Sequence, residues 1–233
     1  MSPPATLALV TGASRGLGYA VASALGARGL QVAALARTVG GLEDLADAIT
    51  AAGGPSPVLV PLSLTDDAGL QRLGLALHER WGRLDLVVHC AAHAAPLAPV
   101  PHIADKDFDT SLAVNLRATE RLVTMLHPLL AASPAGHFIH VGDDCAGAPY
   151  HGSYGATKAG AEAIIRSFAA DSARTGPRVS IFRPRPMPTA LRARFHPGED
   201  RAALTPCADE AARLIATLVD GPPPGLGLGL KSR

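Results

Sequence analysis

A tyrosine and a lysine stand four residues apart, at Tyr154 and Lys158, in a stretch that predicts a helix over residues 153–174. Residues at positions i and i+4 share one face of a helix, so both side chains are expected to reach the same bound molecule. An isolated tyrosine has a pKa of about 10, and a nearby ammonium group stabilises its phenolate form. The pair therefore predicts a tyrosine acid whose pKa the lysine lowers toward working pH.

A glycine-rich loop near the N-terminus is the second group that suggests chemistry. Residues 11–18 read Thr-Gly-Ala-Ser-Arg-Gly-Leu-Gly, directly after a predicted strand and before a predicted helix. Glycines here let the backbone approach a pyrophosphate, and the free N–H groups at the start of the helix bind its charge. Because the loop stands in the required strand–helix context, it predicts a dinucleotide site. The predicted contacts are Gly12, Ser14, Arg15, Gly16, Leu17 and Gly18.

The end of the second predicted strand indicates which dinucleotide binds. About 20 residues beyond the loop, where a carboxylate would bind the ribose of NAD, the chain has Ala36 followed by Arg37. No carboxylate repels a 2′-phosphate there, and Arg15 and Arg37 are suited to bind one through charge-assisted hydrogen bonds. The sequence therefore predicts NADPH/NADP+ as the cofactor. The alternative is that both arginines are solvated surface residues.

Asn115 lies in the middle of an otherwise apolar predicted helix, residues 105–130. A buried amide is costly unless it is hydrogen-bonded, so a defined partner is expected for it.

The elements that must position these residues alternate along the chain. Short apolar runs of strand length are followed by longer helical patterns and are bounded by Gly, Pro or polar residues. This alternation predicts an α/β fold, a doubly wound parallel sheet (Rossmann fold), in a single domain over residues 1–233. The predicted strands are residues 6–10, 31–35, 58–62, 84–89, 137–141 and 179–182, and the predicted helices are residues 17–27, 41–51, 66–80, 105–130, 153–174 and 208–219.

The composition excludes other classes of protein. Hydrophobic residues make up 48% and charged residues 18% of the 233 residues, and the net charge is +1, so neither disorder nor a nucleic-acid or anionic-membrane partner is expected. Cys90, Cys145 and Cys207 form neither a CxxC pair nor a zinc pattern, so reduced thiols and no metal site are expected. No apolar run approaches the roughly 20 residues of a membrane span, and no signal peptide is recognised, so a cytoplasmic location is expected.

Taken together, the glycine loop, Asn115 within Val-Asn-Leu, and the Tyr-Gly-Ala-Thr-Lys sequence ending at Lys158 resemble the short-chain dehydrogenase/reductase family. The resemblance extends from residue 7 to about residue 219. It implies that Tyr154 donates a proton to a carbonyl and that Lys158 binds the nicotinamide ribose and lowers the tyrosine pKa. It also implies that Asn115 supports a proton-relay water. The predicted helices over residues 105–130 and 153–174 resemble the family's subunit interface, which implies a homodimer or homotetramer.

Loops after three other strands match the family pattern in part. Residues 184–189 resemble its Pro-Gly-x-x-x-Thr segment, which places Thr189 at the nicotinamide carboxamide and makes residues 185–200 a substrate lid. Residues 89–92 read His-Cys-Ala-Ala where the family has Asn-Asn-Ala-Gly, and Ser63 stands in place of an aspartate at the adenine. Residues 221–233 form an irregular tail, in which residues 225–230 are a weak candidate for a seventh strand. The further cofactor contacts implied are Ser63, Leu64, Ala91, Ala92, Tyr154, Lys158, Pro184 and Thr189.

The largest departure from the family is the missing catalytic serine. No Ser or Thr occurs in residues 134–152, and aligning the Ala-Gly of residues 146–147 puts Asp144 at the serine position, in a loop that is shorter by about three residues. Asp143 is the alternative, and two solvated carboxylates are a third reading. An ionised aspartate only accepts hydrogen bonds and repels a developing alkoxide.

Either the carboxyl group is protonated and donates as serine does, or the substrate offers it a hydroxyl, an amine or an iminium group. Tyr150, His140 and His151 are candidates for a substitute acid. The leading hypothesis is NADPH-dependent reduction of a ketone or related C=O/C=N group of a small hydrophobic metabolite, with Asp144 as a polar substrate contact. The alternatives are a non-redox dehydratase or isomerase on the same scaffold and an inactive nucleotide-binding regulatory protein.

Overall fold

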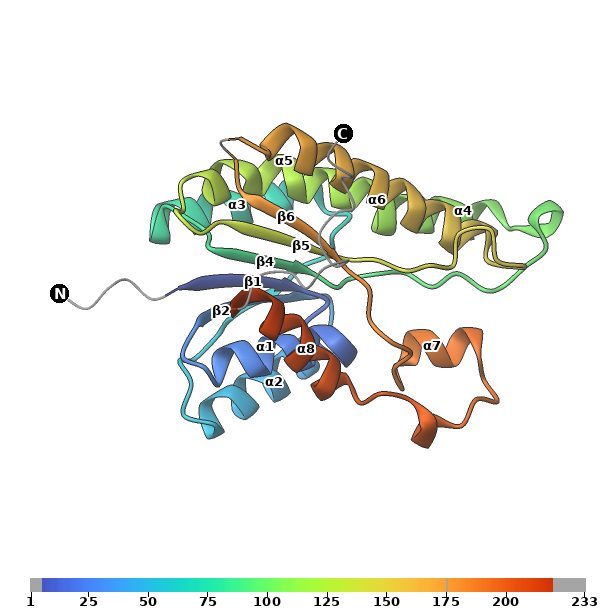
Figure 1. Ribbon diagram of the computed structural model, residues 1–233, viewed down its shortest axis with the longest axis horizontal. Coiled ribbons are helices and arrows are strands. Elements are labelled where there is room, and N and C mark those ends of the chain that lie inside the picture. The colour runs from blue at the N-terminus through green and yellow to red at the C-terminus, as the bar shows by residue number, and fades with distance from the viewer. Residues whose placement is uncertain (1–5, 175, 220–233) are drawn as a thin grey trace.

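In the described part of the chain, six parallel strands form the central sheet, in the order β3-β2-β1-β4-β5-β6 (Figure 1). This order is that of the dinucleotide-binding α/β fold and confirms the predicted single-domain, doubly wound sheet. The computed structural model describes residues 6–174 and 176–219. The strands are β1 (Leu7–Thr11), β2 (Gln31–Ala36), β3 (Val58–Pro61), β4 (Leu86–His89), β5 (His137–Val141) and β6 (Arg178–Phe182).

Helices cover both faces of the sheet, with α1, α2 and α8 on one side and α3, α5 and α6 on the other (Figure 1). Every strand-to-strand pairing is parallel, so each connection crosses the sheet through a helix. The helices are α1 (Gly16–Gly26), α2 (Val39–Ala51), α3 (Asp67–Trp81), α4 (Asp105–Ser111), α5 (Ala118–Ala131), α6 (Gly152–Ser172), α7 (Ala190–Phe195) and α8 (Cys207–Val219), with the short helices η1 (Val100–His102), η2 (Leu112–Arg117) and η3 (Arg201–Ala203).

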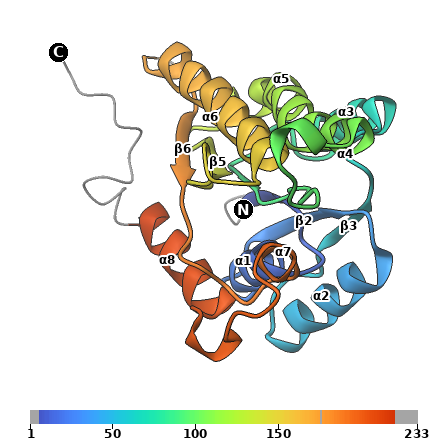
Figure 2. The ribbon, with the colours of Figure 1, turned by 90° about the vertical axis from the view of Figure 1, so that its right-hand side faces the viewer.

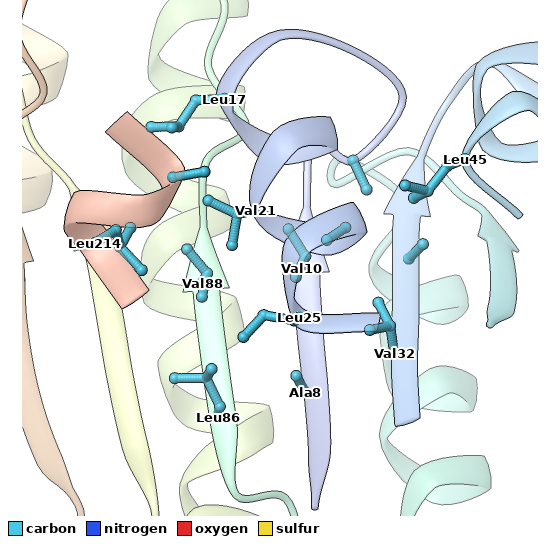
Figure 3. Packing of buried hydrophobic residues seen from close by; sticks show 14 of the residues in the cluster. Ala8, Val10, Leu17, Val21, Leu25, Val32, Leu45, Leu86, Val88 and Leu214 are labelled. Carbon is cyan, nitrogen blue, oxygen red and sulfur yellow. The ribbon is translucent and has the colours of Figure 1, made fainter. Parts of the chain in front are cut away.

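One apolar core lies on each face of the sheet. In the first, Val21 and Leu25 of α1 and Leu214 of α8 pack over Val10 and Val88 of the central strands (Figure 3). In the second, α3, α5 and α6 supply the side chains, and Phe138 of β5 is fully buried among them. Because both faces are covered, the central strands β1, β2 and β4 are mostly apolar rather than alternating, as the sequence suggested.

Two segments differ from the sequence-based expectation. The long helix expected over residues 105–130 is divided into α4, the π-helix η2 and α5, and the wide π turn contains Asn115. The apolar spacing continues across this turn, so periodicity alone cannot locate it. The helix α7 was not expected in a segment with four prolines, but it begins after Thr189, whose hydroxyl accepts the Arg192 N–H at 3.1 Å. The proposed tail and seventh strand lie outside the described residues.

The carboxyl ends of all six strands lie at one edge of the sheet, which faces the viewer in Figure 2. The loops after β1, β4, β5 and β6 meet at this edge, and α7 lies over it in front of α1 (Figure 2). Open α/β sheets bind ligands at this edge, where the strand order reverses beside β1. In residues 6–174 and 176–219, no helix is long and apolar enough to cross a membrane.

Candidate active site and cofactor cleft

A cavity of about 650 Å³ lies at the carboxyl edge of the sheet. The loops after β1, β2, β3, β4, β5 and β6 all contribute to its walls, together with the start of α6 and α7. Every residue that the sequence nominated for the cofactor lies in these walls: Gly12, Ser14, Arg15, Gly16, Leu17, Gly18, Arg37, Ser63, Leu64, Ala91, Ala92, Tyr154, Lys158, Pro184 and Thr189.

The glycine loop is shaped for close approach by a ligand. Gly12 has φ +69°, and a Cβ on it would lie 2.9 Å from the backbone of Ala91. A Cβ on Gly18 would lie 2.3 Å from the Gly12 carbonyl oxygen, so the turn and the first residues of α1 need both glycines. No side chain caps the N-terminus of α1, so its first N–H groups are available to an anion. These residues fit a bound pyrophosphate.

At the far end of this cavity, Arg15 and Arg37 are exposed beside the buried Ala36. Ala36 is the last residue of β2, and Arg37 follows it directly in the cavity wall. No acidic side chain of the described chain lies among the residues that form this end of the cavity. Guanidinium groups at this wall are suited to bind an anionic group.

The aspartate that enters the site is Asp143, and not Asp144 as the family alignment predicted. Asp143 lines the cavity, and its Oδ2 accepts a hydrogen bond of 3.0 Å from the Tyr154 hydroxyl. Asp144 points away: its side chain is 79% exposed and pairs with Arg183 at 2.6 Å. The two side chains point to different sides of the loop, so a one-residue error in aligning the shortened loop exchanges them.

Asp143 also changes the acidity of Tyr154. The sequence predicted that Lys158 lowers the pKa of this tyrosine, but the structure gives the opposite direction. Burial raises the pKa of Tyr154 well above its usual value, and the charges of Asp143 and Cys145 and the hydrogen bond to Asp143 raise it further. The phenol is therefore held protonated, with its proton directed at Asp143.

Lys158 is buried below Tyr154 and is held by the end of β5. Its Nζ donates to the Val141 carbonyl oxygen at 2.5 Å and lies 3.4 Å from His140 Nε2. Burial lowers the pKa of Lys158 to about 8, although the nearby charges of Asp143 and Glu162 oppose this shift. Since Lys158 still lines the cavity, its remaining N–H is available to a bound ligand.

A layer of buried polar groups lies behind Lys158. His140 of β5 and His89 of β4 are paired in register, with ring centroids 5.4 Å apart. Burial lowers the pKa of His89 to about 3 and the pKa of His140 well below its usual value, so both rings are neutral. His89 contacts the hydroxyls of Thr11 at 2.7 Å and Thr119 at 3.1 Å.

Asn115 has the hydrogen-bond partners that its burial requires, but it does not line the cavity. Its Oδ1 accepts the His93 N–H at 2.7 Å, and its Nδ2 donates to the His93 carbonyl at 3.0 Å and to Thr157 at 3.1 Å. Its own carbonyl accepts from Thr119 at 2.8 Å. The side chain therefore joins the loop after β4 to α6, and through it positions the wall that carries His93.

The chain that leaves β6 is fixed on both faces of the sheet. Arg183 pairs with Glu162 of α6, while Arg185 Nε donates to Glu210 of α8 at 2.6 Å. Glu210 is fully buried and also accepts the Arg185 backbone N–H at 3.1 Å. Pro184, which lies between the two arginines, forms part of the cavity wall.

Beyond Pro184, α7 covers the site. The Phe195 ring meets the Tyr154 ring edge to face at 4.9 Å and the His151 ring at 5.0 Å. Arg192 is bound by both oxygens of Glu199 at 2.5 Å, and Arg194 donates to the Ala94 carbonyl at 2.9 Å. The proposed lid therefore places an aromatic ring over the reactive tyrosine.

Three residues suggested as a substitute acid lie elsewhere. Tyr150 is 59% exposed, His151 packs on Phe195, and His140 lies behind Lys158; none of the three forms part of the cavity wall. His93 and Phe195 were not expected at the site from the sequence. His93 lines the cavity, and its Nε2 is buried without a partner in the described chain. Its position directly after Ala91 and Ala92 is the signal that could have identified it.

Comparison with known proteins gives the same assignment. The family model for short chain dehydrogenase matches residues 6–200. D-threitol dehydrogenase of Mycolicibacterium smegmatis is 29% identical over 213 residues, 91% of this chain and 78% of that protein.

Two solved structures share the fold. A proposed short chain dehydrogenase of Escherichia coli CFT073, complexed with NADPH, is 29% identical with a TM-score of 0.87 and covers 91% of this chain and 90% of its own. One of Shigella flexneri 2a str. 301, complexed with NADP, is 29% identical with a TM-score of 0.84 and covers 88% of this chain and 87% of its own. The chain, with its 3-2-1-4-5-6 sheet, its glycine loop and its Tyr154–Lys158 pair, belongs to the short-chain dehydrogenase/reductase family of oxidoreductases.

Proposed function

We propose that the protein is an NADPH-dependent reductase of a C=O or C=N group in a small hydrophobic molecule. One observation carries the proposal: a single cavity joins the glycine loop and two arginines at one end to Tyr154 and Lys158 at the other. The NADP-bound and NADPH-bound relatives support this choice of cofactor.

In this proposal each group has a definite task. Bound NADPH supplies the hydride. Tyr154 holds the proton that a reduced carbonyl oxygen requires, Lys158 binds the nicotinamide ribose, and Asn115 fixes the loop after β4. Ser63, Leu64, Ala91, Ala92, Pro184 and Thr189 form the walls against the cofactor, and residues 185–200 act as the substrate lid.

Cofactor choice is tested by Arg37→Ala. Loss of one charge-assisted contact is worth about 1–3 kcal/mol, so NADPH affinity is expected to fall roughly 5- to 150-fold. NADH lacks the 2′-phosphate, so its affinity is expected to change little. Fluorescence titration with each cofactor measures both dissociation constants.

Arg28→Ala is the matched control, because Arg28 is an exposed arginine that donates to the Ala24 carbonyl oxygen at 2.9 Å and lies outside the cavity. It is expected to bind both cofactors as the parent does. Equal affinity of the parent protein for NADPH and NADH would contradict the assignment. A protein that binds NADPH but oxidises it with no carbonyl or imine compound would favour the non-redox or regulatory alternatives.

Assembly is tested on the outer face of η2 and α6. Leu112, Ala113, Leu116 and Ile164 line an apolar hollow of about 510 Å³ on this face. We expect it to be covered in a homodimer or homotetramer, because a soluble monomer rarely leaves such a surface open. Light scattering at micromolar concentration is expected to give at least twice the chain mass, and Leu116→Glu is expected to shift it toward the monomer. A monomeric parent would contradict this prediction.

A further inference from the structure

The reactive end of the cavity presents a carboxylate where the substrate must bind. Asp143 accepts hydrogen bonds from the Tyr154 hydroxyl and the Cys145 thiol, and it lines the cavity. An ionised carboxylate has four lone-pair sites and no proton to donate. Two of its acceptor positions are occupied by these neighbours, so others are available to a group in the cavity.

This end of the cavity offers few hydrogen-bond donors to a neutral carbonyl. Lys158 uses two of its three N–H groups on Val141 and His140, which leaves one, and the Tyr154 proton is directed at Asp143. Burial and nearby arginines lower the pKa of His93, so its neutral ring offers at most one uncharged N–H and no positive charge to an alkoxide. An alkoxide forming beside Asp143 would be repelled by the carboxylate, which raises the barrier for a neutral ketone.

A cationic nitrogen meets the opposite situation. A carboxylate attracts an iminium cation and raises the pKa of a bound imine, so the nitrogen is protonated when the hydride arrives. The ring of Tyr154 lines the cavity, with Phe195 packed against it, and aromatic rings favour cations. Of the lid arginines, Arg192 has its charge compensated by Glu199, and Arg194 is directed at the Ala94 carbonyl oxygen.

From these contacts we infer that Asp143 determines specificity and selects an iminium ion, the protonated or N-alkylated form of an imine, as the substrate. The inference rests on the proposed NADPH-dependent reduction. Hydride adds to the iminium carbon, the C=N π pair moves to nitrogen, and a neutral amine and NADP+ result. No proton is transferred in this step. The hydrogen bond from the Tyr154 hydroxyl to Asp143 therefore does not impede it.

The test compares three compounds of one bicyclic skeleton. They are dihydroisoquinoline, its N-methyl cation, and the neutral ketone α-tetralone, each supplied with NADPH to the full-length protein. The parent is expected to show a kcat/KM for the N-methyl cation about 10- to 100-fold above that for α-tetralone, the scale of one charge-assisted contact. Asp143→Ser is expected to reverse this preference, and Asp143→Asn is expected to abolish it.

Asp144→Asn is the matched control, because it removes the neighbouring exposed carboxylate and is expected to keep the parent's preference. A parent that reduces α-tetralone as well as the cation would overturn the inference. So would an Asp143→Asn protein that retains the preference, since an amide imitates a protonated carboxyl group and carries no charge.

The two proposals fail in different ways. If the parent reduces neither imine compound while Asp143→Ser reduces α-tetralone, the inference is wrong and the proposed reductase function stands. If neither protein oxidises NADPH with any of the three compounds, although both bind it, both proposals are overturned.

Discussion

Replacing Tyr154 by phenylalanine is expected to lower kcat for a neutral ketone by about 10²- to 10⁴-fold, the usual contribution of a positioned acid. The substitution keeps the ring that packs against Phe195 and removes only the hydroxyl group, which donates a hydrogen bond to Asp143. The fold and the affinity for NADPH are therefore expected to persist. Steady-state rates and fluorescence titration with NADPH measure the two effects separately.

The N-methyl iminium cation provides the internal control for this variant. Its reduction needs no proton, so Tyr154→Phe is expected to lower its kcat by less than about tenfold. The same substitution in the Asp143→Ser protein repeats the ketone measurement in a site without the carboxylate. Undiminished ketone reduction in both backgrounds would show that another group supplies the proton.

An alkaline loss of activity is expected with a midpoint near pH 8. Burial lowers the pKa of Lys158 to about 8, so the ammonium form is present below this pH and is lost as pH rises through it. Above the midpoint kcat/KM is expected to fall by about tenfold per pH unit, because the neutral amine no longer offers a charged contact. Profiles measured between pH 6 and 10 with the N-methyl cation avoid titration of the substrate.

The titration behaviour of the groups that face Lys158 allows the alkaline loss of activity to be assigned to Lys158. His140 and His89 titrate far below pH 8, burial raises the pKa of Cys90 and of Cys145 to about 12, and Tyr154 is held protonated. Asp143 and Glu162 remain, and both raise the pKa of Lys158. Asp143→Asn is therefore expected to move the midpoint to lower pH. A midpoint that moves upward, or a flat profile to pH 10, would contradict the assignment.

The fold and the cofactor half of the site were predictable because each depends on local pattern. A strand, a glycine turn and a helix follow one another within residues 7–26. A parallel sheet brings the carboxyl ends of its strands to one edge, and this does not depend on which side chains the strands carry. Arg37 was found in the same way, as the residue that follows β2. Tyr154 and Lys158 lie one turn apart on one helix, so their proximity required no tertiary information.

The reactive half was harder to predict because it depends on distances between elements. Whether Asp143 or Asp144 enters the cavity depends on one residue of register in a shortened loop. The pKa of Tyr154 depends on how deeply α6 is buried and on which carboxylate lies beside it, and sequence spacing reports neither. The contact of Phe195 with Tyr154 joins residues that are far apart in sequence, through a helix that the proline content concealed.

The fixed position of Pro184 has a consequence for the entropy of binding. Arg183 is held by Glu162 on one face of the sheet and Arg185 by Glu210 on the other, and the ring of Pro184 restricts its own φ. Ordering one residue of free backbone costs about 1–2 kcal/mol, and at this wall that cost is already met during folding. The cofactor therefore meets a preorganised surface, and more of its contact energy is retained as affinity.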